Sequence, residues 1–186
     1  MTWQHTVAIL LGGQSTRMGE PKHLAKLSSG NTLLSSMATF ANQISPRVVI
    51  VGGEVQGFKS IQDLRLNQGP VAGIEALLHS NIDEKYLVVG CDMPRLQPAD
   101  VCALLEANES AIYSFQNQLL GLPIMVSALV KDACSSYLEN GGRSIKGLFK
   151  HIPHQVIQAN ETLASSCSSI NTRSDLDEFA FEEWCS

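Results

Sequence analysis

The stretch VAILLGGQSTRMGEPK, residues 7–22, joins an apolar run to a loop of small and positively charged residues. Consecutive aliphatic residues at 7–11 are typical of a strand that is buried on both faces of a sheet. The loop that follows offers Gly12 and Gly13, whose exposed backbone N–H groups suit phosphate oxygens, and then the cations of Arg17 and Lys22. The stretch therefore predicts a strand that leads into an anion-binding loop.

The glycines of this loop do not follow either of two common phosphate-binding motifs. No Gly-Lys-Ser/Thr follows, as a Walker A loop requires, and the spacing is not GxGxxG. A tight surface turn with incidental charges is the alternative interpretation. The combination of Arg17, Gly19 and Lys22 with the paired glycines favours phosphate binding.

Further along the chain, short apolar runs alternate with segments of helical period. We expect strands at 7–11, 47–53, 86–91, 111–115 and 155–159, and helices at 32–43, 71–80, 98–107, 127–139, 144–151 and 174–184. Apolar strands separated by helices predict a single α/β domain over residues 1–186, with a mostly parallel, twisted, Rossmann-like sheet and helices on both faces. Ligands bind such sheets at the carboxyl ends of the strands, which is where the 12–22 loop begins.

Composition argues against several classes of partner. The chain has 186 residues and a net charge of −5 without a dense Lys/Arg run, so we expect neither nucleic acid nor a membrane surface as a partner. No segment approaches the ~20 apolar residues of a membrane helix. The five cysteines are scattered without a CxxC pair, which favours reduced thiols in a cytoplasmic protein over a disulfide or zinc framework.

A second motif, VVGCDMP at 88–94, places Asp92 directly after an apolar strand. A carboxylate at the carboxyl end of a strand faces the same crevice as the first loop, and it is well placed to hold Mg²⁺ beside substrate phosphates. The alternative is that Asp92 closes a turn or caps a helix before Pro94. Together with the loop at 12–22, the motif favours a metal site.

Two further segments are candidates for the same site. In QGPVAGI, residues 68–74, Gly69 and Gly73 would let a base or a sugar approach the backbone at the start of a helix. In SINTRSDL, residues 169–176, Asn171 offers an amide. A turn with Pro at the first helical position, and capping of the last helix, are the alternative interpretations.

These segments, in this order, resemble the molybdenum cofactor guanylyltransferases, also called the molybdopterin-guanine dinucleotide biosynthesis protein A family. That family belongs to the Rossmann-like nucleotidyltransferases of the nucleotide-diphospho-sugar transferase type. Its motifs LAGGxSxRMGxDK, GPLAG, CDxPFL, GGRSLRxxL and NINTPEDL are similar to LLGGQSTRMGEPK (10–22), GPVAGI (69–74), CDMPRL (91–96), GGRSIKGLF (141–149) and SINTRSDL (169–176). The resemblance spans nearly the whole chain.

The resemblance implies the following site. GTP would be bound by Leu10, Leu11, Gly12, Gly13, Lys22, Asp63, Gly69, Gly73 and Asp92. The catalytic residues would be Arg17, Lys22 and Asp92, with Mg²⁺ held by Asp92. Contacts with the pterin or with a second metal would come from Arg143, Ser144 and Asn171.

The implied reaction is attack of the terminal phosphate of molybdopterin on the α-phosphorus of GTP, which yields the guanine dinucleotide cofactor and pyrophosphate. A phosphate monoester has a second pKa near ~6, so this nucleophile needs no general base. The implied partners are GTP, molybdopterin and the chaperones of molybdenum enzymes.

Two departures from the family keep other functions open. Pro21 stands before Lys22 where the family has Asp, and this Pro-Lys pair is similar to the loop of the cytidylyltransferases. The VGG sequence at 51–53 lacks the Asn that the family often has there. The alternatives are a related enzyme that uses CTP or another triphosphate with molybdopterin or a sugar or alditol phosphate, and a nucleotide-binding partner in cofactor assembly that has no catalytic activity.

Overall fold

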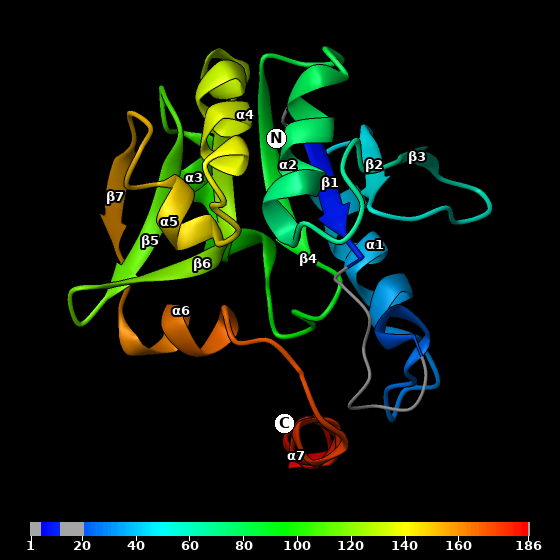
Figure 1. The fold of residues 1–186 in the computed structure, drawn as a ribbon. Coiled ribbons are helices and arrows are strands. Elements are labelled where there is room, and N and C mark those ends of the chain that lie inside the picture. Colours follow the sequence, from blue (N-terminus) through cyan, green and yellow to red (C-terminus); the bar gives the residue numbers. More distant parts are fainter. Residues whose placement is uncertain (1–4, 12–20, 186) are drawn as a thin grey trace.

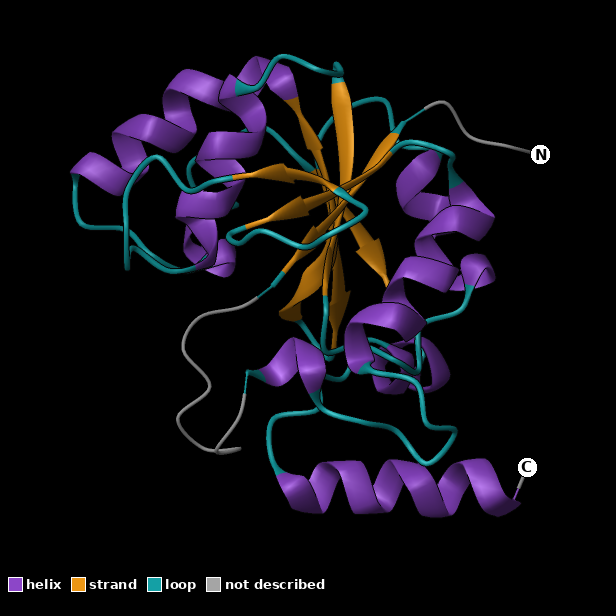
Figure 2. Cartoon of the chain, turned by 90° about the vertical axis from the view of Figure 1, so that its right-hand side faces the viewer, coloured by secondary structure: helices purple, strands orange, loops and turns teal. Residues whose placement is uncertain are grey.

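A single sheet runs through the molecule with helices on both sides (Figures 1 and 2). The computed structural model describes residues 5–11 and 21–185, with side chains as far as residue 181. Within these residues the strands are β1 (Thr6–Leu10), β2 (Val48–Val51), β3 (Lys59–Ile61), β4 (Lys85–Gly90), β5 (Ala111–Phe115), β6 (Gln118–Ser127) and β7 (Gln155–Gln158). Their order across the sheet is β3-β2-β1-β4-β6-β5-β7.

The sheet is mostly parallel, as the sequence predicts. β1 pairs in parallel with β2 and β4, β2 with β3, and β5 with β7. β6 runs antiparallel to both of its neighbours, β4 and β5. We did not expect β3 or β6 from the sequence, and the helix expected from residue 127 begins only after β6 has ended.

Helices cover both faces of the sheet, and α7 lies beyond one end of it (Figures 1 and 2). They are α1 (Leu33–Ile44), α2 (Pro70–His79), α3 (Cys102–Leu105), α4 (Lys131–Glu139), α5 (Ile145–Leu148), α6 (Glu161–Ser166) and α7 (Arg173–Cys185). One face of the sheet packs against α1 and α3, and the other packs against α2, α4 and α5. Both faces of the central strands are therefore buried, which explains their continuously apolar sequence. No helix in the described part of the chain is long and apolar enough to span a membrane.

The central strands end level with one another. Leu10 of β1 lies opposite Val51 of β2 and Gly90 of β4. The ladder continues one step beyond, since the Leu11 N–H donates to the Val51 carbonyl and the Cys91 N–H donates to the Leu10 carbonyl, at 3.0 and 2.9 Å. The segments that leave these strands consequently share one space.

Helix α2 lies unusually close to this edge because Gly73 faces the sheet. A Cβ at this position would lie 3.0 Å from Val51 Cγ1 and 3.3 Å from Leu10 Cδ2. The preceding residues fix where the helix starts, since Gly69 has φ of 76° and Pro70 occupies the first turn. The N-terminus of α2 is thereby held over the ends of β1 and β2.

We expect Leu77→Ala to destabilise the fold by about 2–5 kcal/mol, because this α2 side chain is fully buried between helix and sheet and its truncation leaves a cavity. Leu129→Ala is the matched control, since Leu129 is 95% exposed. Urea unfolding monitored by circular dichroism measures both. Equal midpoints for the two variants would contradict the packing described for α2.

Candidate active site

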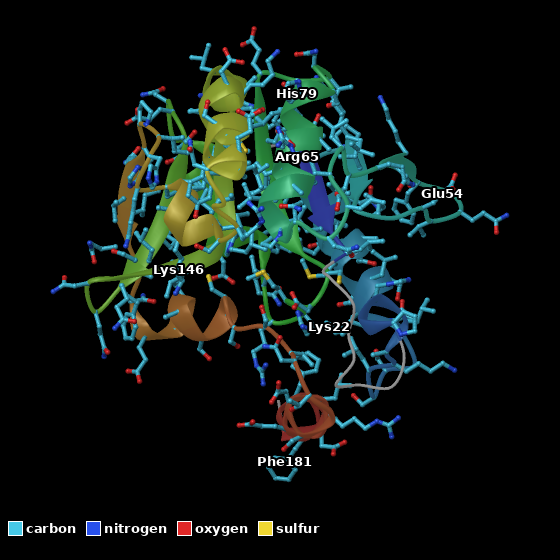
Figure 3. All side chains as sticks on the ribbon, in the orientation of Figure 1. Lys22, Glu54, Arg65, His79, Lys146 and Phe181 are labelled. Carbon is cyan, nitrogen blue, oxygen red and sulfur yellow. The ribbon has the colours of Figure 1, made fainter. Side chains whose placement is uncertain are left out.

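Three side chains distant in sequence meet beyond the ends of the central strands. Lys22 Nζ donates to Asp92 Oδ2 at 2.5 Å and to Asn171 Oδ1 at 2.8 Å. Figure 3 shows Lys22 between the end of the sheet and α7. The Lys22 and Asp92 side chains are only 12% and 19% exposed, so their charges are partly shielded from water. The structure thus brings together three of the residues that the sequence nominated.

Backbone and packing contacts hold these side chains in place. Lys22 opens a 3₁₀ turn over Lys22–Leu24, and the chain then enters a small apolar cluster made by Ala25, Leu27, Leu33, Ile170 and Phe179. This cluster joins the segment after Lys22 to the segment before Asn171. The Ile170 N–H also donates to the Asp92 carbonyl at 2.8 Å. The segment that carries Asn171 therefore contacts both the segment that carries Lys22 and the one that carries Asp92.

The turn that presents Asn171 is held by the first turn of α7. Asp175 Oδ2 accepts from the N–H groups of Asn171 and Thr172 at 2.6 and 2.9 Å, and the Asp175 N–H donates to Thr172 Oγ1 at 3.2 Å. This reciprocal pair is a capping box. The hydrogen bonds from Asn171 and then Thr172 lower the pKa of Asp175 below its usual 3.8. The same hydrogen bonds thus cap α7 and hold Asn171 in place.

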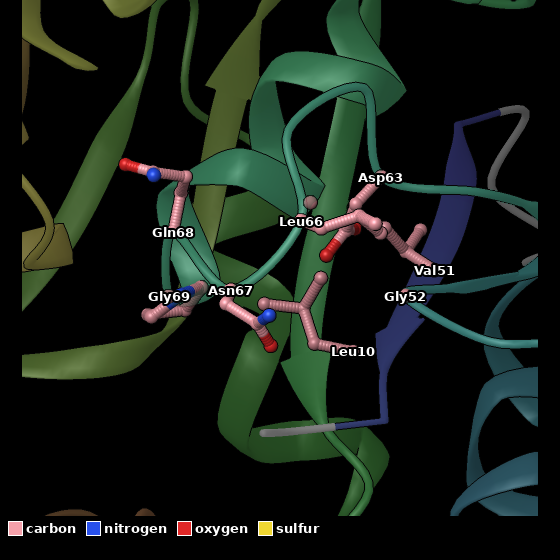
Figure 4. Close-up of a pocket in the computed structure, with 10 residues that line it drawn as sticks. Leu10, Val51, Gly52, Asp63, Leu66, Asn67, Gln68 and Gly69 are labelled. Atoms are coloured by element: carbon pink, nitrogen blue, oxygen red, sulfur yellow. The ribbon is translucent and has the colours of Figure 1, made fainter. Parts of the chain in front are cut away.

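A pocket of about 270 Å³ lies at the same edge of the sheet (Figure 4). It is lined by Leu10, Val51, Gly52, Asp63, Leu66, Asn67, Gln68, Gly69, Pro70 and Gly73. Four of these, Leu10, Asp63, Gly69 and Gly73, were nominated from the sequence. The floor is apolar and the 62–69 segment supplies most of the polar groups, an arrangement that suits a flat heterocycle.

Asp63 is the unusual member of this pocket. Its Oδ1 atom is buried and has no hydrogen-bond partner among the described residues. Burial raises the pKa of Asp63 above its usual 3.8, because the charged form loses hydration. Buried polar atoms are nearly always paired in native proteins, so this unpaired oxygen marks Asp63 as a candidate ligand-binding residue of the pocket.

The remaining nominated residues have other surroundings. Arg143 Nη1 donates to the carbonyls of Leu138 and Gly142 at the end of α4, and Ser144 Oγ accepts from Gly147 N–H at the start of α5. Both therefore cap helices, a role that is additional to the pterin or second-metal contact implied by the resemblance. The Leu11 carbonyl accepts from Cys91 Sγ at 3.2 Å.

Three nominated residues, Gly12, Gly13 and Arg17, lie outside the described residues, so the structure gives no account of them.

Several pocket residues had no signal in the sequence. Gly52 directly follows β2, whereas Leu66, Asn67 and Gln68 reach the pocket because β3 returns the chain to the end of β2. Their proximity to Gly69 was the one available indication. Asn67 has φ of 58°, a conformation for which Asn is favoured, but that preference marks a turn and not a ligand.

The fold and this edge define a nucleotidyltransferase of the α/β class. Residues 7–156 match the family model described as MobA-like NTP transferase domain, and the chain belongs to that family. The family expected from the sequence is thereby confirmed.

Curated relatives match most of the length of the chain. A molybdenum cofactor guanylyltransferase from Xanthomonas euvesicatoria pv. vesicatoria is 30% identical over 146 residues, which is 77% of each chain. Another from Shewanella putrefaciens is 26% identical over 188 residues, which covers 94% of this chain and 95% of the relative.

Solved structures share the fold at lower identity. Molybdopterin-guanine dinucleotide biosynthesis protein A from Archaeoglobus fulgidus superposes with a TM-score of 0.82 at 22% identity, covering 97% of this chain and 100% of that one. The 2-C-methyl-D-erythritol 4-phosphate cytidylyltransferase from Thermus thermophilus has a TM-score of 0.69 at 15% identity, covering 96% and 98%. Since both kinds of protein share the fold, the fold alone does not select the base.

We expect Asp175→Ala to lower nucleotidyl transfer about tenfold, because Asn171 loses the acceptor that orients it. Asp177→Ala, at an exposed position of the same helix, is the control. Pyrophosphate release measures both. Equal rates for the two variants would show that Asp175 is a helix cap and nothing more.

The lowered pKa of Asp175 also has a consequence for stability. Its carboxylate stabilises the fold at pH values above its usual pKa, and this contribution is lost as pH falls through the lowered pKa.

Proposed function

We propose that the chain transfers GMP from GTP to the terminal phosphate of molybdopterin and releases pyrophosphate. Two findings support the reaction: the relatives named molybdenum cofactor guanylyltransferase, and the convergence of Lys22, Asp92 and Asn171 beside a pocket of suitable shape. The observation that carries the choice of base is the buried, unpartnered carboxylate oxygen of Asp63.

The hydrogen-bonding edge of guanine complements a carboxylate. Guanine offers adjacent donors, N1–H and the 2-amino group, whereas the equivalent position of cytosine, N3, is an acceptor. An ionised aspartate only accepts hydrogen bonds, so it would pair with guanine and would repel the N3 lone pair of cytosine. Asp63 therefore favours GTP over CTP at this pocket.

The positive groups at the strand ends would bind the phosphates. Lys22 would place its ammonium against the triphosphate, and Gly12, Gly13 and Arg17 would add backbone N–H groups and a second cation, as the resemblance implies. These contacts would hold the α-phosphorus in line with the attacking oxygen and balance charge on the leaving pyrophosphate.

The oxygens around Lys22 suit a magnesium ion. Asp92 and Asn171 both contact one ammonium group, so this point stabilises positive charge, and carboxylate and amide oxygens are ligands that Mg²⁺ accepts. The described residues hold no group of three or more His, Cys, Asp or Glu side chains that could bind a metal by themselves. The ion would then share its ligands with substrate phosphates and water, and it would neutralise charge on them.

The acceptor needs little from the protein beyond a binding place. Its phosphate is largely ionised at neutral pH, so no general base is required. We propose the 141–144 segment as part of the acceptor site, because the Arg143 carbonyl lies against Gly69 at the N-terminus of α2. Arg143 and Ser144 would adopt this role in addition to capping their helices.

A CTP-dependent transferase is the second candidate, since Pro21 before Lys22 resembles the cytidylyltransferase loop. Base selectivity separates the two functions directly.

Thermal unfolding with GTP, CTP, UTP and ATP, each with Mg²⁺, tests the proposal. We expect only GTP to shift the midpoint, since a ligand at ~100 times its Kd stabilises the fold by roughly 2.7 kcal/mol. Asp92→Ala should remain folded, lose most of the magnesium-dependent shift and release no pyrophosphate. A shift with CTP alone would support the second candidate. A GTP shift without pyrophosphate release from wild type and molybdopterin would indicate a binding protein without catalytic activity.

The pH dependence of binding tests Asp63. Guanine pairs with the ionised carboxylate, so GTP affinity should be highest above the raised pKa of Asp63 and should fall as pH is lowered through it. Asp63→Asn should bind GTP about 10- to 150-fold more weakly at pH 7, the loss expected when hydrogen bonds to a charged group are removed. Calorimetric Kd values for wild type and variant over a pH series provide the measurement. Their ratio cancels the titration of the triphosphate itself, and a constant ratio would argue against this role.

Asp132→Asn, an exposed carboxylate on α4, is the matched control and should bind GTP as wild type does.

A further inference from the structure

The segment between β3 and α2 carries an ion-pair network that the proposed reaction does not use. Arg65 stands in sequence between two pocket residues, Asp63 and Leu66, but it does not belong to the pocket lining. Its Nε donates to Glu75 Oε2 at 2.9 Å and its Nη2 donates to Glu139 Oε1 at 3.1 Å. Figure 3 shows Arg65 beside α2. One side chain therefore connects the 62–69 segment to both α2 and α4.

The pairing with Glu75 is the stronger of the two anchors. Glu75 is only 2% exposed, whereas the Glu139 side chain is 63% exposed. A buried carboxylate without a partner is costly, so Glu75 strongly favours conformations in which Arg65 stays bound to it. The pKa of Arg65 is raised, first by the hydrogen bond to Glu75 and then by the one to Glu139.

Few other contacts fix this segment. Residues 62–68 belong to no helix or strand, and their only assigned regular feature is a turn at Leu66 and Asn67. The side chains on either side of Arg65 add little packing, since Leu64 and Leu66 are 61% and 79% exposed. An exposed leucine in a pocket wall does not stabilise the free protein, but it would bury apolar surface against a bound base.

We propose that Arg65 is the positioning residue of the base pocket, whose ion pairs to Glu75 and Glu139 hold the 62–69 segment so that Asp63 and Leu66 contact the base. This inference rests on the proposed function, because it takes the pocket to be the nucleotide-base site. Arg65 itself touches no substrate. Its effect reaches the nucleotide through the two pocket residues beside it.

A positioning role makes a distinctive kinetic prediction. Lys22 and Asp92 lie on other segments and are held by other contacts, so the rate at saturating nucleotide should be little changed when Arg65 is replaced. The KM for GTP should rise instead, and discrimination between GTP and CTP should fall, because Asp63 is no longer held against the base. A purely structural role would lower the folded fraction, and with it kcat, at constant KM.

The experiment compares Arg65→Ala with Arg65→Lys and with Arg47→Ala. We expect Arg65→Ala to raise KM for GTP about tenfold with kcat within about twofold of wild type, and Arg65→Lys to recover part of the loss, since it keeps the charge but not the two-pronged geometry. Arg47 is the matched control because it forms an ion pair with Asp83, at 3.3 Å, before the amino ends of β2 and β4. Arg47→Ala should leave the KM for GTP unchanged.

A double-mutant cycle with Leu66 tests the route of the effect. Leu66→Ala should weaken GTP binding in the wild-type background and have a smaller effect in the Arg65→Ala background, since residues acting through one arrangement are not additive. Leu64→Ala, an exposed leucine outside the pocket lining, is its control and should be neutral in both backgrounds. Additive effects of Arg65 and Leu66 would overturn the inference.

The remaining outcomes are also decisive. If Arg65→Ala does not fold, Glu139→Gln removes only the exposed anchor and should raise KM in the same direction by a smaller factor. An unchanged KM in both Glu139→Gln and Arg65→Lys would then overturn the inference. If wild type binds GTP and Arg65→Ala has the same KM for GTP as wild type, only the positioning role of Arg65 is refuted. Wild type that binds no nucleoside triphosphate refutes the proposed function, and the positioning role with it.

Discussion

The register of β1 with its two neighbours is the constraint on which the rest of the structure depends. Leu10 lies level with Val51 and Gly90, so the segments leaving three strands must share one space. This register follows from burial: with apolar side chains on both faces, a slip of one residue would disturb two cores at once. The close seating of α2 at Gly73 adds the start of a helix to the same space. Packing alone thus gathers the residues from which the site is made.

Electrostatics then organises what packing has gathered. Without the ammonium of Lys22 between them, the partly shielded carboxylate of Asp92 and the exposed amide oxygen of Asn171 would face each other. Lys22 therefore balances the charge of Asp92. A triphosphate arriving with a cation would bring both a new partner for Lys22 and a new partner for Asp92, so binding can exchange these contacts without leaving a charge unpaired. This exchange of partners supports the proposal that the substrate binds here with its phosphates and a metal ion together.

The sequence predicts those parts that are encoded locally. β1, β2, β4, β5 and β7 are visible as apolar runs, Lys22 is recognisable from the glycine-rich loop that follows β1, and Asp92 from its place just after β4. β6 was not expected because Gly121 and Pro123 interrupt its pattern, and β3 is a short edge strand with a polar sequence. Asn171 was nominated through resemblance, since no local rule predicts contact with a lysine 149 residues away. Arg65 was not nominated at all, because its role depends on partners in two helices that only the fold brings near.

Two ionic arrangements hold the two halves of the site by separate means. Lys22, Asp92 and Asn171 converge where phosphates and metal are proposed to bind, whereas Arg65, Glu75 and Glu139 restrain the segment that faces the base. Among the described residues, the hydrogen bonds and ion pairs of one set include no member of the other, so a change in the 62–69 segment would alter base preference while the phosphate site stays intact. Under the proposed function, this separation would give a physical reason why one fold accommodates both guanylyl and cytidylyl transfer: the common chemistry would depend on the strand ends, and the choice of base on a short segment that is anchored from outside the pocket.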